Sequence, residues 1–181
     1  MRTLLAAADI RREVERLGSR IDREFPEGPL VIVGVLTGCV LFLADLVRAI
    51  SRPVRIALIQ ASSYRGEATR PGELRFDLDG LPNLQNLPVL LLDDIFDTGR
   101  TLSTLRAELL ARGATSVQTV VLLWKSARRE VELLPDHYAF EIPDEFVVGY
   151  GLDYNDDFRN LPEIAVLEPC DIEAFRASPP S

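Results

Sequence analysis

The chain of 181 residues is poor in the residue types that build disulfide frameworks and zinc motifs. It has two cysteines, Cys39 and Cys170, far apart in the sequence, and a single histidine, His137. This spacing excludes a disulfide framework or a zinc motif, and free thiols are typical of a reducing cytoplasm. His137 has no ligand-like neighbours, so we expect it to be structural or solvated, in a loop.

Long apolar runs and an excess of basic residues are also missing. No run approaches the ~18 apolar residues of a membrane-spanning helix, and the start of the chain has no apolar core for a signal peptide. Twenty Lys and Arg stand against 28 Asp and Glu, a formal net charge of −8. This balance argues against nucleic acid as the main partner but allows a local basic pocket. We therefore expect a soluble cytoplasmic protein with no membrane or nucleic-acid partner.

The residues that are present have the pattern of a globular α/β domain, with 47% apolar and 27% charged residues. Apolar periodicity predicts an amphipathic helix over 4–25, strands over 30–36 and 54–59 around a helix over 40–50, a strand from 89, a helix after 101 and a strand over 116–125. This order favours a central, mostly parallel sheet flanked by helices. We expect one domain over 1–181, with a core of about 30–135 and a small hood formed by about 136–181 together with the N-terminal segment.

The most informative stretch is Val89–Thr101, which reads VLLLDDIFDTGRT. Four apolar β-formers predict a strand buried on both faces, and Asp93 and Asp94 follow them, pointing to opposite faces if the strand continues. A polar loop then precedes the helix; its residues are Asp97, Thr98, Gly99, Arg100 and Thr101. A strand, a loop and a helix in this order bind phosphate with backbone N–H groups, and the two acids can accept hydrogen bonds from ribose hydroxyls. The alternative is an ordinary turn with surface acids and a helix cap.

Two further segments are candidates for the same site. Lys125 ends the strand over 116–125, where its side chain is expected to enter the crevice at the carboxyl ends of the strands; the alternative is a solvated strand end. The segment 62–76 is polar and without period, which is typical of a functional lid or, alternatively, of a merely flexible insertion.

Val89–Thr101 resembles the phosphoribosyl-diphosphate binding motif of the type I phosphoribosyltransferases. That motif has an apolar strand, two acids, two apolar residues, an acid, Thr, Gly, any residue and Thr. Other segments resemble the hypoxanthine-guanine branch of this family: 34–38 with 44–46, 63–64, 122–125, and 146–154 with Arg159. The last of these is the most specific, because it separates the chain from the adenine, orotate and uracil branches.

The resemblance implies a purine salvage enzyme, a pentosyltransferase. Such an enzyme transfers the phosphoribosyl group of 5-phosphoribosyl 1-diphosphate to N9 of hypoxanthine or guanine, giving IMP or GMP and pyrophosphate. It also implies Mg²⁺ as cofactor and a homodimer or homotetramer. A preference for xanthine, or a non-catalytic nucleotide-sensing regulator on the same fold, is an alternative reading.

Roles for individual residues are implied by the same resemblance. The backbone from Asp97 to Thr101 would bind the 5′-phosphate. The remaining expectations are Asp93 and Asp94 at the ribose hydroxyls, directly or through magnesium; Asp153 at a second magnesium; Lys125 at the purine O6; Phe146 stacked on the base with Val147 at its exocyclic edge; Leu36, Thr37, Gly38 and Arg159 at pyrophosphate; and Ser63 and Tyr64 on the lid.

The chemistry of their side chains also supports the roles expected for Asp97 and Lys125. A carboxylate at the purine N7 would accept its proton and make N9 more nucleophilic, although Asp is also a favoured helix cap. A lysine ammonium donates and never accepts, so it favours a 6-oxo purine over adenine.

Thr37 departs from the family, which usually has a basic residue there. Pyrophosphate binding is therefore expected to be weaker, and the sequence leaves open whether the Leu36–Thr37 peptide is cis or trans.

Overall fold

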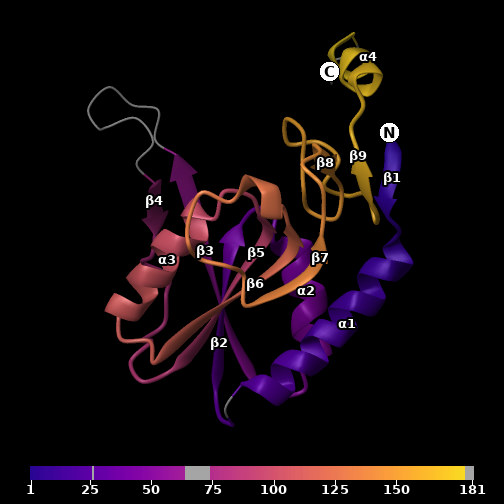
Figure 1. Ribbon diagram of the computed structural model, residues 1–181. Helices are drawn as coiled ribbons and strands as arrows, with labels where there is room; N and C mark the ends of the chain where they lie inside the picture. The colour runs from indigo at the N-terminus through magenta and orange to yellow at the C-terminus, as the bar shows by residue number, and fades with distance from the viewer. Residues whose placement is uncertain (26, 64–73, 178–181) are drawn as a thin grey trace, which may run out of the picture.

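A six-stranded sheet forms the centre of the computed structural model, which describes residues 1–25, 27–63 and 74–177. The order of its strands is β4-β3-β2-β5-β6-β7 (Figure 1). Their bounds are β2 Leu30–Leu36, β3 Val54–Ser63, β4 Leu74–Asp77, β5 Pro88–Phe96, β6 Ser116–Trp124 and β7 His137–Glu141. Neighbouring strands are parallel except at the edge, where β4 is antiparallel to β3. The expectation of a mostly parallel sheet is confirmed.

Helices cover both faces of this sheet, which explains why its inner strands are apolar without interruption. Helices α1 (Ala7–Glu24) and α2 (Val40–Ala49) lie on one side in Figure 1, and α3 (Arg100–Ala111) lies on the other. Alternate residues of β5 divide between two buried clusters: Leu90 and Leu92 pack with α1 and α2, and Val89 and Leu91 pack with α3. A strand that is buried on both faces needs apolar residues at every position.

A second, three-stranded sheet lies beyond one end of the first and has the order β1-β9-β8. Its strands are β1 Arg2–Leu5, β8 Val147–Val148 and β9 Ile164–Val166. Together with the loop 149–163 and the C-terminal helix α4 (Pro169–Ala177), this sheet is called the hood below (Figure 1). The predicted helix over 4–25 was wrong at its start, because residues 2–5 pair with β9 as a strand instead.

Four other elements differ from the sequence-based expectation. His137 begins β7 and is buried, so its expected place in a loop was wrong. The Asp136 carboxylate accepts hydrogen bonds from the backbone N–H and the hydroxyl of Thr119, which fixes β7 beside β6. Strand β3 continues to Ser63, and neither helix α4 nor the short 3₁₀ helix η1 (Ser126–Arg128) was anticipated. The expected lid falls largely in 64–73, outside the described residues.

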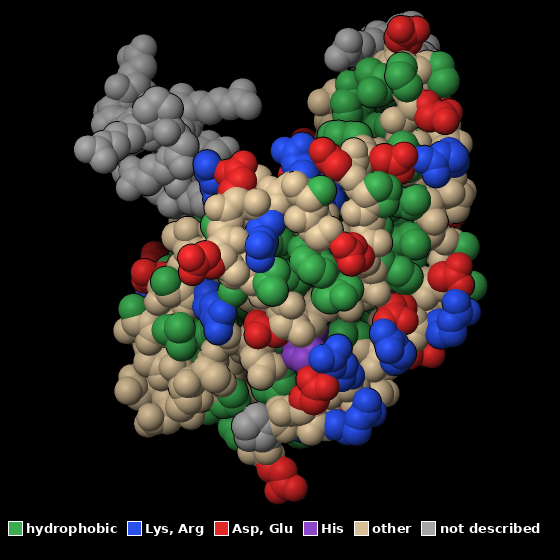
Figure 2. All heavy atoms as spheres, viewed as in Figure 1, with side chains coloured by type: hydrophobic (Ala, Val, Ile, Leu, Met, Phe, Trp, Pro, Cys, Tyr) green, Lys and Arg blue, Asp and Glu red, His purple; other side chains and the backbone are tan. Residues whose placement is uncertain are grey.

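The surface agrees with the acidic composition. Figure 2 shows Lys and Arg side chains interleaved with Asp and Glu on the described part of this face, without a broad basic area. None of the described helices combines the length and the apolarity that a membrane span requires.

Candidate active site

A pocket of about 310 Å³ lies at the carboxyl end of β5, next to the start of α3. Its lining includes most of the predicted phosphate and ribose residues, namely Asp93, Asp94, Asp97, Thr98, Gly99 and Thr101. The pocket is open rather than filled by packed side chains, and both acids share it with the loop. The central expectation from the sequence, acids and an amide-lined loop around one cavity, therefore agrees with the geometry.

The loop at 97–101, called the phosphate cup below, is shaped by Gly99. This residue has φ +80°, and a Cβ atom there would lie 2.4 Å from Cζ of Phe96, so both the backbone and the space require glycine. Gly99 is the N-cap of α3 and provides no side-chain hydrogen bond to the first turn. The first amides of a helix have no intrahelical acceptor, so they are suited to bind an anion.

Arg100 contributes to the phosphate cup differently from its neighbours. Its side chain is mostly exposed and does not line the pocket, and its guanidinium pairs with Glu130 at 2.6 Å. Arg100 can take part in the cup only through its backbone N–H, which donates a long hydrogen bond of 3.4 Å to the hydroxyl of Thr98. This agrees with a motif in which any residue is tolerated at that position.

Asp93 and Asp94 form a half-buried acidic pair near the carboxyl end of β5. The backbone N–H of Asp94 donates to the Asp93 carboxylate at 3.0 Å. Burial and the neighbouring Asp94 raise the pKa of Asp93 well above its usual range, and burial raises the pKa of Asp94, with Arg159 opposing the shift. Two adjacent carboxylates that resist ionising together fit a hard divalent cation such as Mg²⁺, whose charge offsets their repulsion.

The turn after β2 lies against this acidic pair. A Cβ atom on Gly38 would be 1.6 Å from Asp94 Oδ2, so only glycine allows this approach. The Leu36–Thr37 peptide is cis, which answers the question that the sequence left open. Thr37 is exposed, and its carbonyl accepts from the Val40 N–H at 3.2 Å.

The hood contacts the turn after β2 through a second glycine, Gly151. A Cβ atom on Gly151 would lie 2.1 Å from the carbonyl oxygen of Gly38, so the two backbones touch. Arg159 donates to the Gly151 carbonyl at 2.8 Å and pairs with Asp153 at 2.8 Å. The structure thus brings together Gly38, Asp94, Asp153 and Arg159, the residues expected near pyrophosphate and metal.

A cluster of alternating charge lies on the other side of the phosphate cup. Lys125 is 8% exposed, and its Nζ lies 3.5 Å from Asp144 Oδ1. Arg128 lies 2.8 Å from Asp97 Oδ1 through Nε, and 3.5 Å from the same Asp144 oxygen through Nη1. Asp97 Oδ1 is shielded from solvent but accepts no hydrogen bond with acceptable geometry within the described residues. The contact with Arg128 is therefore an ion pair that occupies Oδ1, and because the Asp97 side chain is 40% exposed, its other oxygen, Oδ2, is the one open to a ligand.

Phe146 lies two residues beyond this cluster and is 52% exposed, although large aromatic side chains are usually covered. Its ring meets Tyr154 edge to face at 5.8 Å. Val147 follows in β8 and is buried. An exposed ring two residues after a carboxylate that contacts Lys125 is suited to a flat, polar-edged ligand.

The sequence reasoning missed Arg128 and Asp144. Each belongs to a short polar segment with several charges, and nothing in the sequence distinguishes Arg128 from Arg129 or Asp144 from Glu145. Of the two predicted lid residues, Ser63 ends β3, and Tyr64 lies outside the described residues. Cys39 is buried beside the acids; burial, Asp93 and Asp94 raise its pKa to about 12, so its thiol is unreactive.

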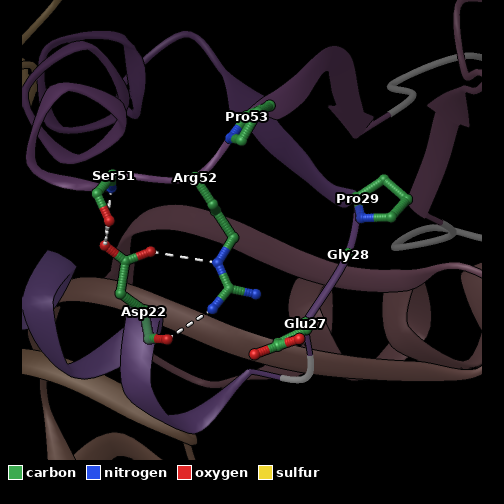
Figure 3. A pocket seen from close by; sticks show the side chains of 7 residues that line it. All are labelled: Asp22, Glu27, Gly28, Pro29, Ser51, Arg52 and Pro53. Carbon is green, nitrogen blue, oxygen red and sulfur yellow. Dashed lines mark hydrogen bonds and ion pairs between the residues drawn. The ribbon is translucent and has the colours of Figure 1, made fainter.

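A larger hollow of about 500 Å³ lies at the opposite, amino end of the strands, and it is not the chemical site (Figure 3). Figure 3 shows Arg52 extended toward Asp22, with dashed lines to its carboxylate and its carbonyl. Ser51 donates to the same carboxylate through its backbone N–H and its hydroxyl, and Asp22 lies in the last turn of α1. These contacts join α1 to the start of β3. The charged side chains Asp22 and Arg52 are therefore used to hold two elements together.

Comparison with known proteins shows the family of this chain. A family model described as the phosphoribosyl transferase domain matches residues 2–155. The chain belongs to the phosphoribosyltransferase family. This phosphoribosyltransferase is 40% identical to the hypoxanthine-guanine phosphoribosyltransferase of Aquifex aeolicus over 169 residues, which cover 93% of this chain and 95% of that protein. It is 38% identical to the Staphylococcus aureus protein of the same name over 92% of this chain and 93% of that one.

Solved structures place the chain in the same branch. A Staphylococcus aureus hypoxanthine phosphoribosyltransferase has a TM-score of 0.85 at 37% identity, covering 92% of both chains. The Trypanosoma cruzi enzyme in complex with its product IMP also has a TM-score of 0.85 at 37% identity, covering 92% of this phosphoribosyltransferase and 94% of that chain. The resemblance that the sequence motifs indicated is therefore confirmed.

Proposed function

We propose that this phosphoribosyltransferase transfers the 5-phosphoribosyl group of 5-phosphoribosyl 1-diphosphate to N9 of hypoxanthine or guanine, releasing pyrophosphate in purine salvage. The main support for the proposal is that two subsites lie next to each other at the carboxyl end of the sheet. The phosphate cup and the acidic pair form one subsite. Lys125, Asp97 and the exposed Phe146 form the other.

Each subsite suits one part of the reaction. The amides of the phosphate cup hold the 5′-phosphate, and Asp93 and Asp94 accept from the ribose hydroxyls or hold Mg²⁺, with Asp153 at a second ion. Magnesium, when bound, offsets the negative charge of the departing pyrophosphate. Thr37 and Gly38 offer backbone N–H groups to that leaving group, and Arg159 offers its cation from the hood.

The purine subsite explains the expected choice of base. Lys125 donates to O6 and stabilises the charge that grows there, while the exposed oxygen of the Asp97 carboxylate, Oδ2, accepts the N7 proton as N9 attacks. Adenine would leave the nearly buried Lys125 facing an amino group, at a cost of about 1–3 kcal/mol. Phe146 stacks on the ring, with the backbone of Val147 at its exocyclic edge.

The deciding experiment measures nucleotide formation from phosphoribosyl diphosphate, Mg²⁺ and each purine in turn. Asp97→Asn should lower turnover about a hundredfold with phosphoribosyl diphosphate binding retained. Lys125→Ala should raise the KM for both 6-oxo bases and relax the rejection of adenine. No IMP or GMP at high enzyme concentration would favour the regulator, and a higher efficiency with xanthine than with either other base would favour the xanthine enzyme.

Thr37 allows a separate test of the departure from the family. If the side chain at this position matters, Thr37→Lys should strengthen product inhibition by pyrophosphate, because it adds a cation beside the expected leaving group. Unaltered inhibition would mean that the backbone alone binds there. Since Thr37 is exposed, the change leaves the core intact.

We also propose that one domain of 1–181 carries this activity in the cytoplasm, as a homodimer or homotetramer. The two free thiols support a reducing location. Ile56 and Leu58 on β3 are 50% and 45% exposed, and Leu58 lies near Leu43 of α2, which supports a covered apolar surface. Sedimentation should give a multiple of 20.2 kDa that falls toward the monomer in Ile56→Asp; a monomeric parent chain contradicts the assembly alone.

A further inference from the structure

Arg128 holds a central position in the charge cluster beside the phosphate cup. It ends η1, and its backbone N–H donates to the Lys125 carbonyl at 3.1 Å, so it lies one tight turn beyond Lys125. This turn directs its guanidinium back over the site, where it meets Asp97 at 2.8 Å and Asp144 at 3.5 Å. A planar guanidinium with several donors can contact two carboxylates at once, which an ammonium cannot do in the same geometry.

Asp144 is shared between two cations. Its Oδ1 lies 3.5 Å from Lys125 Nζ and 3.5 Å from Arg128 Nη1. Asp144 comes from the turn before the hood and is half exposed, so its side chain has room to shift. Without Arg128, the attraction of Asp144 would fall on Lys125 alone, and the ammonium would be drawn toward the carboxylate and away from a purine O6.

The contact between Arg128 and Asp97 acts on the expected proton acceptor rather than on Lys125. Arg128 holds the carboxylate by charge, but Asp97 Oδ1 accepts no well-formed hydrogen bond from it or from the other described residues. The carboxylate is therefore fixed in place through Oδ1, while the exposed part of the side chain leaves Oδ2 able to accept a proton from a bound base. Both effects act on groups that contact the purine, and neither requires Arg128 to touch it.

We propose that Arg128 is a positioning residue of the purine subsite: by pairing with Asp97 and Asp144 together, it fixes the acceptor for the purine N7 proton and prevents Asp144 from capturing Lys125. This inference rests on the proposed function of Asp97 and Lys125. If Asp97→Asn and Lys125→Ala are fully active, the subsite itself is wrong. If they are impaired but Arg128 variants are normal, only the role of Arg128 fails.

The test compares Arg128→Met with Arg129→Met, its exposed neighbour, for which the described residues include no ion pair. Arg128→Met should raise the KM for hypoxanthine about fivefold, with the KM for phosphoribosyl diphosphate unchanged, since a half-exposed pair contributes only about 1 kcal/mol. Arg129→Met should leave both constants unchanged, and Arg128→Lys should restore part of the purine affinity. An unchanged purine KM in Arg128→Met, or an equal rise in Arg129→Met, overturns the proposal.

A double variant tests the competition for Lys125 directly. Adding Asp144→Asn to Arg128→Met removes the carboxylate that would capture the ammonium, so it should lower the raised purine KM by about threefold. In the parent chain, where Arg128 shares Asp144, the same change should lower the purine KM by less than it does beside Arg128→Met, and the difference between the two effects measures the coupling. If Asp144→Asn has the same effect in both backgrounds, the two residues are uncoupled and the proposal is wrong. Circular dichroism of all variants reports whether the fold is kept.

Discussion

The phosphate cup and the purine subsite are neighbours that are built in different ways. The cup is one uninterrupted segment in which glycine geometry sets the backbone amides that we propose bind the phosphate. The purine subsite is assembled from side chains of separate segments: Asp97 after β5, Lys125 and Arg128 after β6, and Asp144 and Phe146 before β8. The cup should therefore tolerate changes of side chain but not of backbone conformation, and the purine subsite should respond to distant changes in packing.

The largest effect is expected from Gly99→Ala, which tests whether backbone conformation governs the cup. Alanine at φ +80° is strained, and its Cβ would lie 2.4 Å from Phe96 and 2.6 Å from Val131. The efficiency with phosphoribosyl diphosphate should fall about a hundredfold, because displaced amides no longer match the phosphate. Gly80→Ala is the matched control, since an added Cβ there meets nothing within 4 Å. Steady-state kinetics with equal losses in both variants would contradict this view of the cup.

A smaller effect is expected from Phe175→Ala, which tests whether distant packing governs the purine subsite. Phe175 of α4 contacts Tyr154 at 5.7 Å and Phe158 at 5.5 Å, and Tyr154 in turn contacts Phe146. Removing the ring frees Tyr154 and hence Phe146, so the KM for hypoxanthine should rise about fivefold while that for phosphoribosyl diphosphate stays constant. Phe175→Tyr keeps the ring and should behave like the parent chain. A rise in both KM values would mean that α4 supports the whole fold instead.

Tyr150→Phe examines how the hood is attached to the core. The Tyr150 hydroxyl donates to Asp45 of α2 at 2.5 Å, and burial together with this bond raises the pKa of the phenol. Asp45 keeps Arg48 as a partner, so losing the hydroxyl should lower the free energy of unfolding by only about 1 kcal/mol. Urea denaturation measures this change, and kinetic constants should remain those of the parent. A loss of purine affinity alone would show that the hood moves when this bond is absent.

His137 lies outside both regions and gives the smallest expected effect, in the pH dependence of stability. Burial, with Arg20 adding to it, lowers the pKa of His137, although Glu24 at 3.8 Å opposes the shift. Because the unfolded chain then binds the proton more readily, this residue's contribution is complete above about pH 6.5 and is lost as pH falls toward the lowered folded pKa. Denaturation between pH 7 and 5 should show a shallower loss for His137→Gln. Identical slopes would contradict the assignment.

The same contrast explains what could be predicted. Continuous apolar runs at Leu30–Leu36 and from Val89 predicted buried strands, and the structure has them in the centre of the sheet. The last two residues of strand β1 were mistaken for helix because its partner, β9, is about 160 residues away in sequence, and local propensity carries no information on such a pairing. Likewise β7 depends on Asp136 reaching Thr119 of β6, a contact between segments that no local pattern announces.

The sequence by itself determined the parallel core and the phosphate cup, because both depend on the order of neighbouring residues: apolar runs that need cover on two faces, and a glycine that allows one backbone conformation. Only the tertiary structure decided the partners of Lys125 and Asp97. Arg128 and Asp144 are chosen from several similar charged residues by the 3₁₀ turn after β6 and by the path of the chain into the hood. Charge acts through space, so the residues that tune a site are those that folding brings within a few ångströms, whatever their separation along the chain.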